Sequence, residues 1–278
     1  MARKNLFERL DKLGVDVRTE YKALIRLLKI EQCIGYSYSY HTLIEYINEH
    51  YFRSLPATFR SPYLSVGEMM TALKLRDEST NLDDLFLLSE LLIALMPLKY
   101  VEQNESVQRQ ANTIVSNIIA FLEKLNYELY EIENNRYIIV AKNHATTQAV
   151  EAINDNATAI SLIEYNHYSM KGDLEGKRNI LTVLGSYIEP ILKSRVLQNA
   201  GYRQLESDVG FMLNCFHVRH NNKIGAKAQE YIVALTDKQL EKWYDNLYNA
   251  ILSVIIINDH IPVQTELASL KTSYNWKM

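Results

Sequence analysis

The stretch from Thr236 to about Ile257 constrains the fold most, because its apolar residues recur at the spacing of one helix face. Thr236 is followed three residues later by Gln239, the pair that forms a capping box at a helix start. The stripe consists of Leu240, Trp243, Tyr244, Leu247, Tyr248, Ile251 and Ile255. A helix with such a face must bury it against other helices, so a helical bundle is predicted.

The same helical spacing recurs through most of the chain. Helices are predicted over residues 6–13, 21–34, 41–52, 82–96, 107–125, 145–154, 157–168, 174–188 and 205–216, and another is predicted to begin at residue 66 behind Ser65. Asp173 is expected to cap the 174–188 helix. Glu175, Lys177 and Arg178 mark the exposed side of this helix, and Pro190 is expected to kink or end it. Nine glycines and five prolines in 278 residues are too few for a β-sandwich or a βαβ array. The expected core of the C-terminal region is Leu213, Phe216, Trp243, Leu247 and Ile251.

One segment has a different period. Residues 127–133 alternate apolar and polar side chains, Asn134 and Asn135 tolerate positive φ, and residues 136–141 are rich in strand formers. This pattern predicts a β-hairpin with a two-residue turn, which must pack on helices or on a partner to be stable. The fold class is therefore mainly α, with two helical domains joined by a hairpin. The expected boundaries are 1–126, 127–142 and 143–278.

Composition narrows the cellular setting. Apolar residues make up 47% and charged residues 23%, which excludes a largely disordered chain. The net charge of −3 does not indicate a general nucleic-acid binder, although one surface can still be basic. Cys33 and Cys215 lie in apolar helical contexts, which suits a reducing compartment. The first residues lack a signal-peptide core, and the longest apolar run, residues 85–98, is interrupted and too short for a bilayer. We therefore expect a cytoplasmic protein without membrane contact.

Polar residues gather at the end of the predicted 205–216 helix. An arginine can bind a phosphate with its planar fork, and a histidine can act as general acid or base on a ribose hydroxyl near neutral pH. These are the groups that metal-independent RNA cleavage requires. The catalytic candidates are Arg219, His220 and His217, and the binding candidates are Asn221, Asn222, Lys223 and Arg203.

Other interpretations of this cluster stay open. In a structural one, Arg219 pairs with Asp208 or caps helix carbonyls, and the two asparagines end the helix. In a metal-binding one, His217 and His220 share a helix face, but Cys215 points elsewhere and no fourth ligand is near in sequence, so no metal is predicted. The chain also lacks the phosphate-loop, dinucleotide, serine-esterase and paired-cysteine motifs, so no cofactor is expected.

The C-terminal half resembles a known family. Residues 208–216, the sequence Arg219-His220-Asn221-Asn222, and residues 235–257 are similar to the C-terminal region of small bacterial proteins related to abortive infection. That region resembles the HEPN class of helical domains. The resemblance implies a helical bundle in which an arginine, a following polar residue and a later histidine form an RNase centre, usually across a dimer. Residues 127–141 and 172–178 also resemble segments of these proteins.

This chain departs from the family pattern at one position. Arg219 matches the arginine and His220 the polar residue, but residues 223–225 are lysine, isoleucine and glycine, and the next histidine is His260. Two functions therefore follow from the resemblance. One is an RNase effector of phage defence in which His217 or His220 replaces the missing histidine. The other is a binding or regulatory module that has lost catalysis.

The expected partners follow from the same reasoning. RNA is the expected ligand of the arginine–histidine cluster, and the apolar, aromatic C-terminal helix suits a homodimer interface. A phage or host protein is the expected trigger, with the N-terminal domain governing the response. A third, non-enzymatic reading is a structural interaction protein without a small-ligand site.

Overall fold

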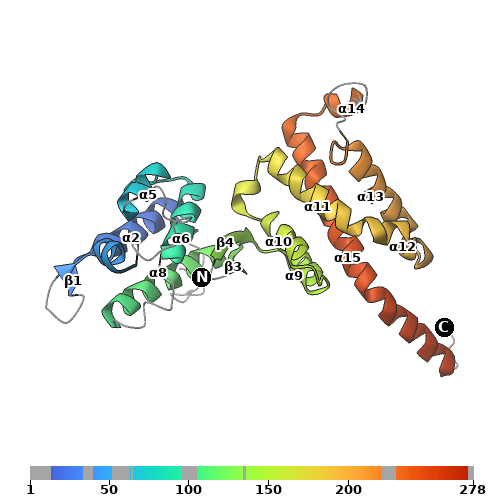
Figure 1. The fold of residues 1–278 in the computed structure, drawn as a ribbon, viewed down its shortest axis with the longest axis horizontal. Coiled ribbons are helices and arrows are strands. Elements are labelled where there is room, and N and C mark those ends of the chain that lie inside the picture. The colour runs from blue at the N-terminus through green and yellow to red at the C-terminus, as the bar shows by residue number, and fades with distance from the viewer. Residues whose placement is uncertain are drawn as a thin grey trace, which may run out of the picture. The chain divides into compact units, whose positions relative to one another are not determined.

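The computed structural model describes residues 14–33, 40–51, 63, 65–95, 105–133, 136–220 and 230–274. The chain divides into two compact units, Met1–Ala141 and Lys142–Met278. Both consist mainly of helices, and Figure 1 labels these along the chain. The predicted fold class, mainly α with a β-hairpin over residues 127–141, is confirmed at this level.

The first unit combines helices with two short antiparallel pairs of strands. Its helices are α2 (Val17–Lys29), α3 (Leu43–Tyr46, continued by a π-helical turn Ile47–Tyr51), α5 (Val66–Ala72), α6 (Leu82–Leu95) and α8 (Glu105–Lys124). Its strands are β1 (Gln32–Cys33) with β2 (Tyr40–His41), and β3 (Tyr127–Glu133) with β4 (Arg136–Ala141). The second pair is the predicted hairpin, with Tyr127 opposite Ala141 and an irregularity between Glu131 and Glu133.

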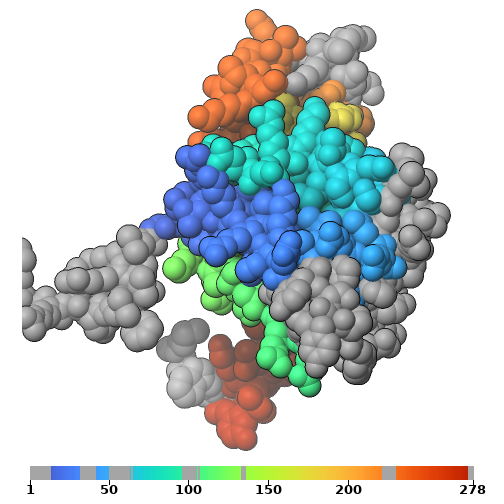
Figure 2. All heavy atoms as spheres, turned by 90° about the vertical axis from the view of Figure 1, so that its left-hand side faces the viewer, coloured from blue at the N-terminus to red at the C-terminus, as the bar shows by residue number. Residues whose placement is uncertain are grey.

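The hairpin packs on the helices of the first unit. The rings of Phe86 on α6 and Tyr127 on β3 lie 4.7 Å apart, and the backbone N–H of Ile139 donates to Oε1 of Glu90 at 2.7 Å. These contacts supply the support that an isolated hairpin lacks. Elsewhere in this unit, α2 and the α5–α6 region adjoin on one face (Figure 2), where Arg18 and Lys22 both pair with Glu78.

The second unit is a bundle around one long helix. It contains α9 (His144–Glu151), α10 (Asn156–Glu164), a 3-10 turn (Tyr168–Met170), α11 (Leu174–Lys193), α12 (Val196–Asn199), α13 (Arg203–Cys215), α14 (Glu230–Val233) and α15 (Asp237–Ser273). The predicted capping residues are confirmed: Thr236 and Gln239 form a complete capping box, and Asp173 accepts from the backbone N–H of Gly176.

Four of the five residues that were predicted for the core of this bundle are buried in the structure. Leu213, Phe216, Leu247 and Ile251 are buried, as predicted. Trp243 was expected in the core and is 40% exposed, so that expectation is wrong. Successive side chains on an α-helix point roughly 100° apart, so Trp243 and its neighbour Tyr244 cannot both face the centre of the core. The fully buried Tyr244 faces it. Trp243 therefore lies at the edge of the stripe.

Two helices continue past a proline, including Pro190, which was expected to kink or end its helix. Pro190 lies inside α11, and Pro262 lies inside α15, which continues to Ser273 instead of ending near Ile257. Proline removes one backbone donor but has a φ that a helix accepts, so a helix can continue through it at a cost. Figure 1 shows the last turns of α15 running on beyond the other helices of the second unit.

Candidate functional site

The arginine–histidine residues follow α13 rather than continuing it. We call residues 216–220 the Arg-His segment. Helix α13 ends at Cys215, and His217 has a φ of 61°, a left-handed conformation that turns the chain. The backbone N–H of Arg219 then donates to the carbonyl oxygen of Leu213 at 3.1 Å. The expectation that His217 and His220 share a helix face is therefore wrong, because the segment between them is not helical.

The Arg-His segment lies along one face of α11. Three contacts join them in chain order: Arg178 Nε to the oxygen of His217 at 2.6 Å, Thr182 Oγ1 to the oxygen of Val218 at 3.5 Å, and Arg219 Nη2 to the oxygen of Gly185 at 3.1 Å. Residues 178, 182 and 185 occupy successive turns of one helix face. The segment is thus held on α11 by its backbone and by the side chain of Arg219.

The guanidinium of Arg219 is only partly engaged. Its Nη2 also lies 3.7 Å from Oε2 of Glu189, and the side chain is 24% exposed. A hydrogen bond from Lys193, together with the charge of Arg219, lowers the pKa of Glu189, so this carboxylate is ionised near neutral pH. Within the described part of the chain, Nε and Nη1 of Arg219 have no partner. Part of the fork is therefore available to an anion.

The structural interpretation of Arg219 needs a correction. Asp208, its expected partner, instead accepts a hydrogen bond from Gln204 at 2.7 Å on α13. The expected carbonyl contact does occur, although its acceptor, Gly185, lies inside α11 rather than at the end of α13.

The other binding candidates do not join Arg219 in the described structure. Arg203 is the first residue of α13 and the Arg-His segment follows the last, so the helix separates them by about 18 Å. Asn221, Asn222 and Lys223 lie outside the described residues. His217 is half-buried and His220 is exposed, so the segment carries two imidazoles in different environments.

Aromatic rings surround the first residue of the Arg-His segment. We call Phe211, Phe216, Tyr231 and Trp243 the aromatic cluster. The ring of Phe216 lies 4.7 Å from Trp243, 5.9 Å from Phe211 and 6.1 Å from Tyr231. Phe216 is buried, while Phe211, Tyr231 and Trp243 are 54%, 43% and 40% exposed. No local sequence pattern indicates this cluster, because its members come from three helices and a turn.

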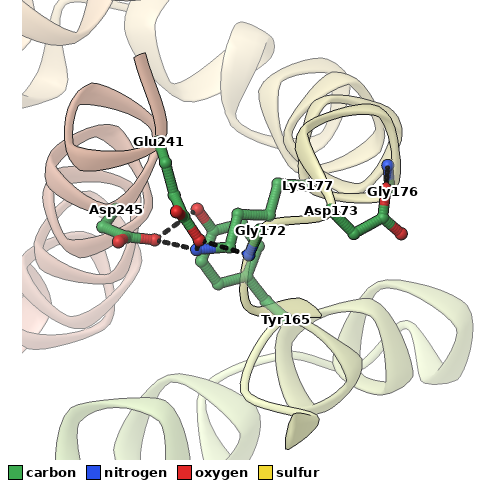
Figure 3. Close-up of polar contacts among 7 residues, drawn as sticks. All are labelled: Tyr165, Gly172, Asp173, Gly176, Lys177, Glu241 and Asp245. Atoms are coloured by element: carbon green, nitrogen blue, oxygen red, sulfur yellow. Dashed lines mark hydrogen bonds and ion pairs between the residues drawn. The ribbon is translucent and has the colours of Figure 1, made fainter. Parts of the chain in front are cut away.

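A second polar group lies between α11 and α15 (Figure 3). We call Tyr165, Lys177, Glu241 and Asp245 the Lys177 group. The ammonium of Lys177 lies 2.9 Å from Oε1 of Glu241 and 2.7 Å from Oδ1 of Asp245, and its side chain is only 7% exposed. The hydroxyl of Tyr165 donates to Asp245 at 3.0 Å. Lys177 was expected on the exposed side of its helix, and that expectation is wrong because these partners hold it inside.

The ion pairs and hydrogen bonds of the Lys177 group have a structural role. Burial raises the pKa of Glu241, but the hydrogen bonds from Gly172 and Lys177 outweigh it, so its pKa is lowered. Burial, together with the charge of Asp245, raises the pKa of Tyr165 well above its usual range, so this phenol keeps its proton. Lys177 also lies 5.4 Å from the centroid of the Tyr165 ring, a cation–π contact. Each charge has a close partner, and the group ties α11 to α15.

A hydrogen-bond network continues from this group into α9 and α10. The rings of Tyr165 and Tyr248 stack at 4.0 Å, and burial raises the pKa of Tyr248 to about 12. Its hydroxyl is bonded to Thr146 at 2.8 Å and to Asn166 at 2.7 Å. These buried polar atoms satisfy one another and fix α9 and α10 against α15.

Among the described residues, no three histidine, cysteine or acidic side chains come together as a metal site. Nor does any described helix have both the length and the apolar character to cross a bilayer. No protein-family model matches the chain, and no curated protein or solved structure is significantly similar to it.

Proposed function

We propose that the second unit binds single-stranded RNA through the Arg-His segment and the aromatic cluster, without cleaving it. The proposal rests on one observation. The partly engaged guanidinium of Arg219 lies three residues from Phe216, which contacts three exposed aromatic rings. At 3.8 Å per residue the two Cα atoms are at most about 11 Å apart, close enough for neighbouring nucleotides of one strand.

The two parts have complementary roles in RNA binding. The Nε and Nη1 atoms of Arg219 offer the fork that pairs with a phosphate. The exposed rings of Phe211, Tyr231 and Trp243 offer flat surfaces on which bases stack, worth about 1–3 kcal/mol per base. A site of this kind attracts RNA locally, which is compatible with a net charge of −3 for the whole chain.

Two features favour binding over cleavage. Metal-independent cleavage requires an acid and a base at one phosphate and a cation for the developing charge. Glu189 lies 3.7 Å from Arg219, so part of that cationic charge is already neutralised. The next histidine along the chain, His260, lies about 25 Å along α15 from Trp243, too far to supply the missing proton-transfer group.

The resemblance to abortive-infection proteins supplies the biological setting. In that setting, a HEPN-like bundle that has lost catalysis acts in phage defence by binding RNA as a signal or target. An active RNase effector, using His217 or His220, is the second candidate function. Two imidazoles within one short segment beside Arg219 favour it.

The test compares two arginines at the two ends of α13. Fluorescein-labelled single-stranded RNA is titrated with the full chain and with the variants Arg219→Gln and Arg203→Gln, and the same samples are run on denaturing gels. Both variants remove one positive charge, and Arg203 is exposed and lies about 18 Å from the segment.

The expected result is a loss of affinity of about tenfold for Arg219→Gln, equivalent to about 1.4 kcal/mol, with intact RNA throughout. Arg203→Gln should differ from the wild type by less than about twofold, since it removes only a distant screened charge. Equal affinities of the two variants, or no binding by the wild type, would refute the proposal. RNA cut by the wild type and not by Arg219→Gln would establish the RNase function instead.

A further inference from the structure

The end of α15 carries apolar side chains that nothing in the described chain covers. Val263, Leu267, Leu270 and Tyr274 are 44%, 46%, 53% and 78% exposed. We call them the α15 stripe. Their spacing of four, three and four residues places them on one face of the helix, as the a and d positions of a coiled coil are placed. Four large apolar residues in one exposed row mark an interaction surface.

The opposite face of the same turns is polar and already satisfied. Three hydroxyl groups there donate to carbonyl oxygens one turn earlier: Thr265 to Ile261, Ser269 to Thr265, and Thr272 to Ala268. These residues are compatible with solvent, so the stripe is the face of this helix that a partner would cover.

We infer that the α15 stripe pairs with the α15 stripe of a second copy of this chain, with the two helices parallel. The charged residues that flank the stripe indicate that the partner is a second copy. Glu266 directly precedes Leu267, and Lys271 directly follows Leu270, so they take the g and e positions beside the stripe. In a parallel pair, a g residue faces the e residue five positions further along the other helix, which is the separation of Glu266 and Lys271.

The symmetry of the pair decides the orientation. Two parallel copies form two equivalent Glu266–Lys271 contacts, one on each side of the stripe. In two antiparallel copies with Val263 opposite Tyr274, Glu266 would instead lie near Ser273 and Lys271 near Gln264, so neither would meet an opposite charge. The charges therefore match a second copy in one orientation, and this inference is independent of the proposed RNA binding.

The stripe is short, so the dimer is expected to be reversible. From Val263 to Tyr274 the helix rises about 16 Å, which is fewer than two full heptads. A contact of this length buries much less than the roughly 800 Å² per partner of a standard interface. The monomer and dimer should therefore exchange with protein concentration.

The first experiment is sedimentation velocity of the full chain over a wide range of concentrations. The wild type should pass from monomer to dimer, and Leu267→Asp should weaken the dimer at least tenfold. Thr265→Asp adds the same charge on the polar face two residues away and should leave dimerisation unchanged. Because both side chains are exposed, neither change should alter the circular dichroism spectrum.

A charge exchange tests the orientation. Glu266→Lys and Lys271→Glu should each weaken the dimer severalfold, because each creates two like-charged contacts, and the double variant should restore it. In an antiparallel dimer neither residue faces a charge, so each single change would have little effect. A wild type that stays monomeric, a dimer unaffected by Leu267→Asp, or a double variant without rescue would overturn the inference.

Discussion

The Nη2 atom of Arg219 donates to the carbonyl oxygen of Gly185 at 3.1 Å. Gly185 also lies against α13, since a Cβ atom there would lie 2.7 Å from Cδ2 of Leu213. The absence of a side chain at this residue therefore leaves room for Leu213 beside the carbonyl that holds Arg219. The geometry of the Arg-His segment depends on the packing beneath it.

Gly185→Ala should destabilise the second unit by about 1–3 kcal/mol, because the new Cβ atom would force the side chain of the fully buried Leu213 to shift within the core. Gly210→Ala is the matched control, since nothing lies within 4 Å of a Cβ there, and it should be neutral or stabilising by up to about 1 kcal/mol. Both tryptophans lie in the second unit, so urea unfolding followed by tryptophan fluorescence measures the difference. Equal effects of the two changes would contradict this assignment.

Lys177→Met should destabilise the second unit by about 2–4 kcal/mol. It leaves Glu241 and Asp245 facing each other without a cation, and the half-exposed Asp245 lowers the loss below that of a fully buried pair. The same substitution at the exposed neighbour Lys242 should change stability by less than about 0.5 kcal/mol. The same urea experiment measures both changes in stability. A small effect at Lys177 would show that its ion pairs contribute little to the stability of the second unit.

The stability that Glu241 contributes should depend on pH. Its folded pKa lies below the ordinary value of 4.5, so the contribution is complete above pH 4.5 and is lost as the pH falls through the folded pKa. The difference in unfolding free energy between the wild type and Glu241→Gln should therefore shrink as the pH drops below 4.5. A difference that stays constant down to acid unfolding would rule out this linkage.

Expression in a bacterial host tests binding against cleavage in cells. If the chain binds RNA without cleaving it, total RNA should stay intact both with the wild type and with the Arg219→Ala/His220→Ala double variant. Growth and RNA integrity are followed together after induction. Growth arrest with RNA fragmentation in the wild type alone would establish a nuclease effector and identify its site.

The sequence was informative where local chemistry decides the structure. The caps at Asp173 and Thr236 and the alternation of residues 127–133 act over a few residues, and the structure contains the helices and the strand that they predict. The end of α13 was missed for a physical reason. His217 turns the chain with a φ of 61°, which any non-glycine residue adopts rarely, while the apolar period continues through Phe216 and Val218.

The contacts of the candidate site were harder to predict because they join distant parts of the chain. Glu241 and Asp245 lie 64 and 68 residues from Lys177, and no local pattern shows that their charges meet. Sequence proximity was also misleading for Arg203, because the helix between it and Arg219 keeps them apart. The rings of the aromatic cluster come together only in the folded bundle, so the sequence alone does not group them.

Because α15 is continuous, it fixes the distance between two surfaces of the second unit. Trp243 of the aromatic cluster and Val263 of the α15 stripe lie about 30 Å apart along one helix. In a parallel dimer the two copies of the RNA-binding surface would then lie at the same end of the helix pair. The two α15 helices would fix the distance between them. An RNA long enough to reach both would bind bivalently, with an affinity far above that of either surface alone, whereas a shorter one would gain nothing. The length of a single strand would thus become a property that the protein can recognise.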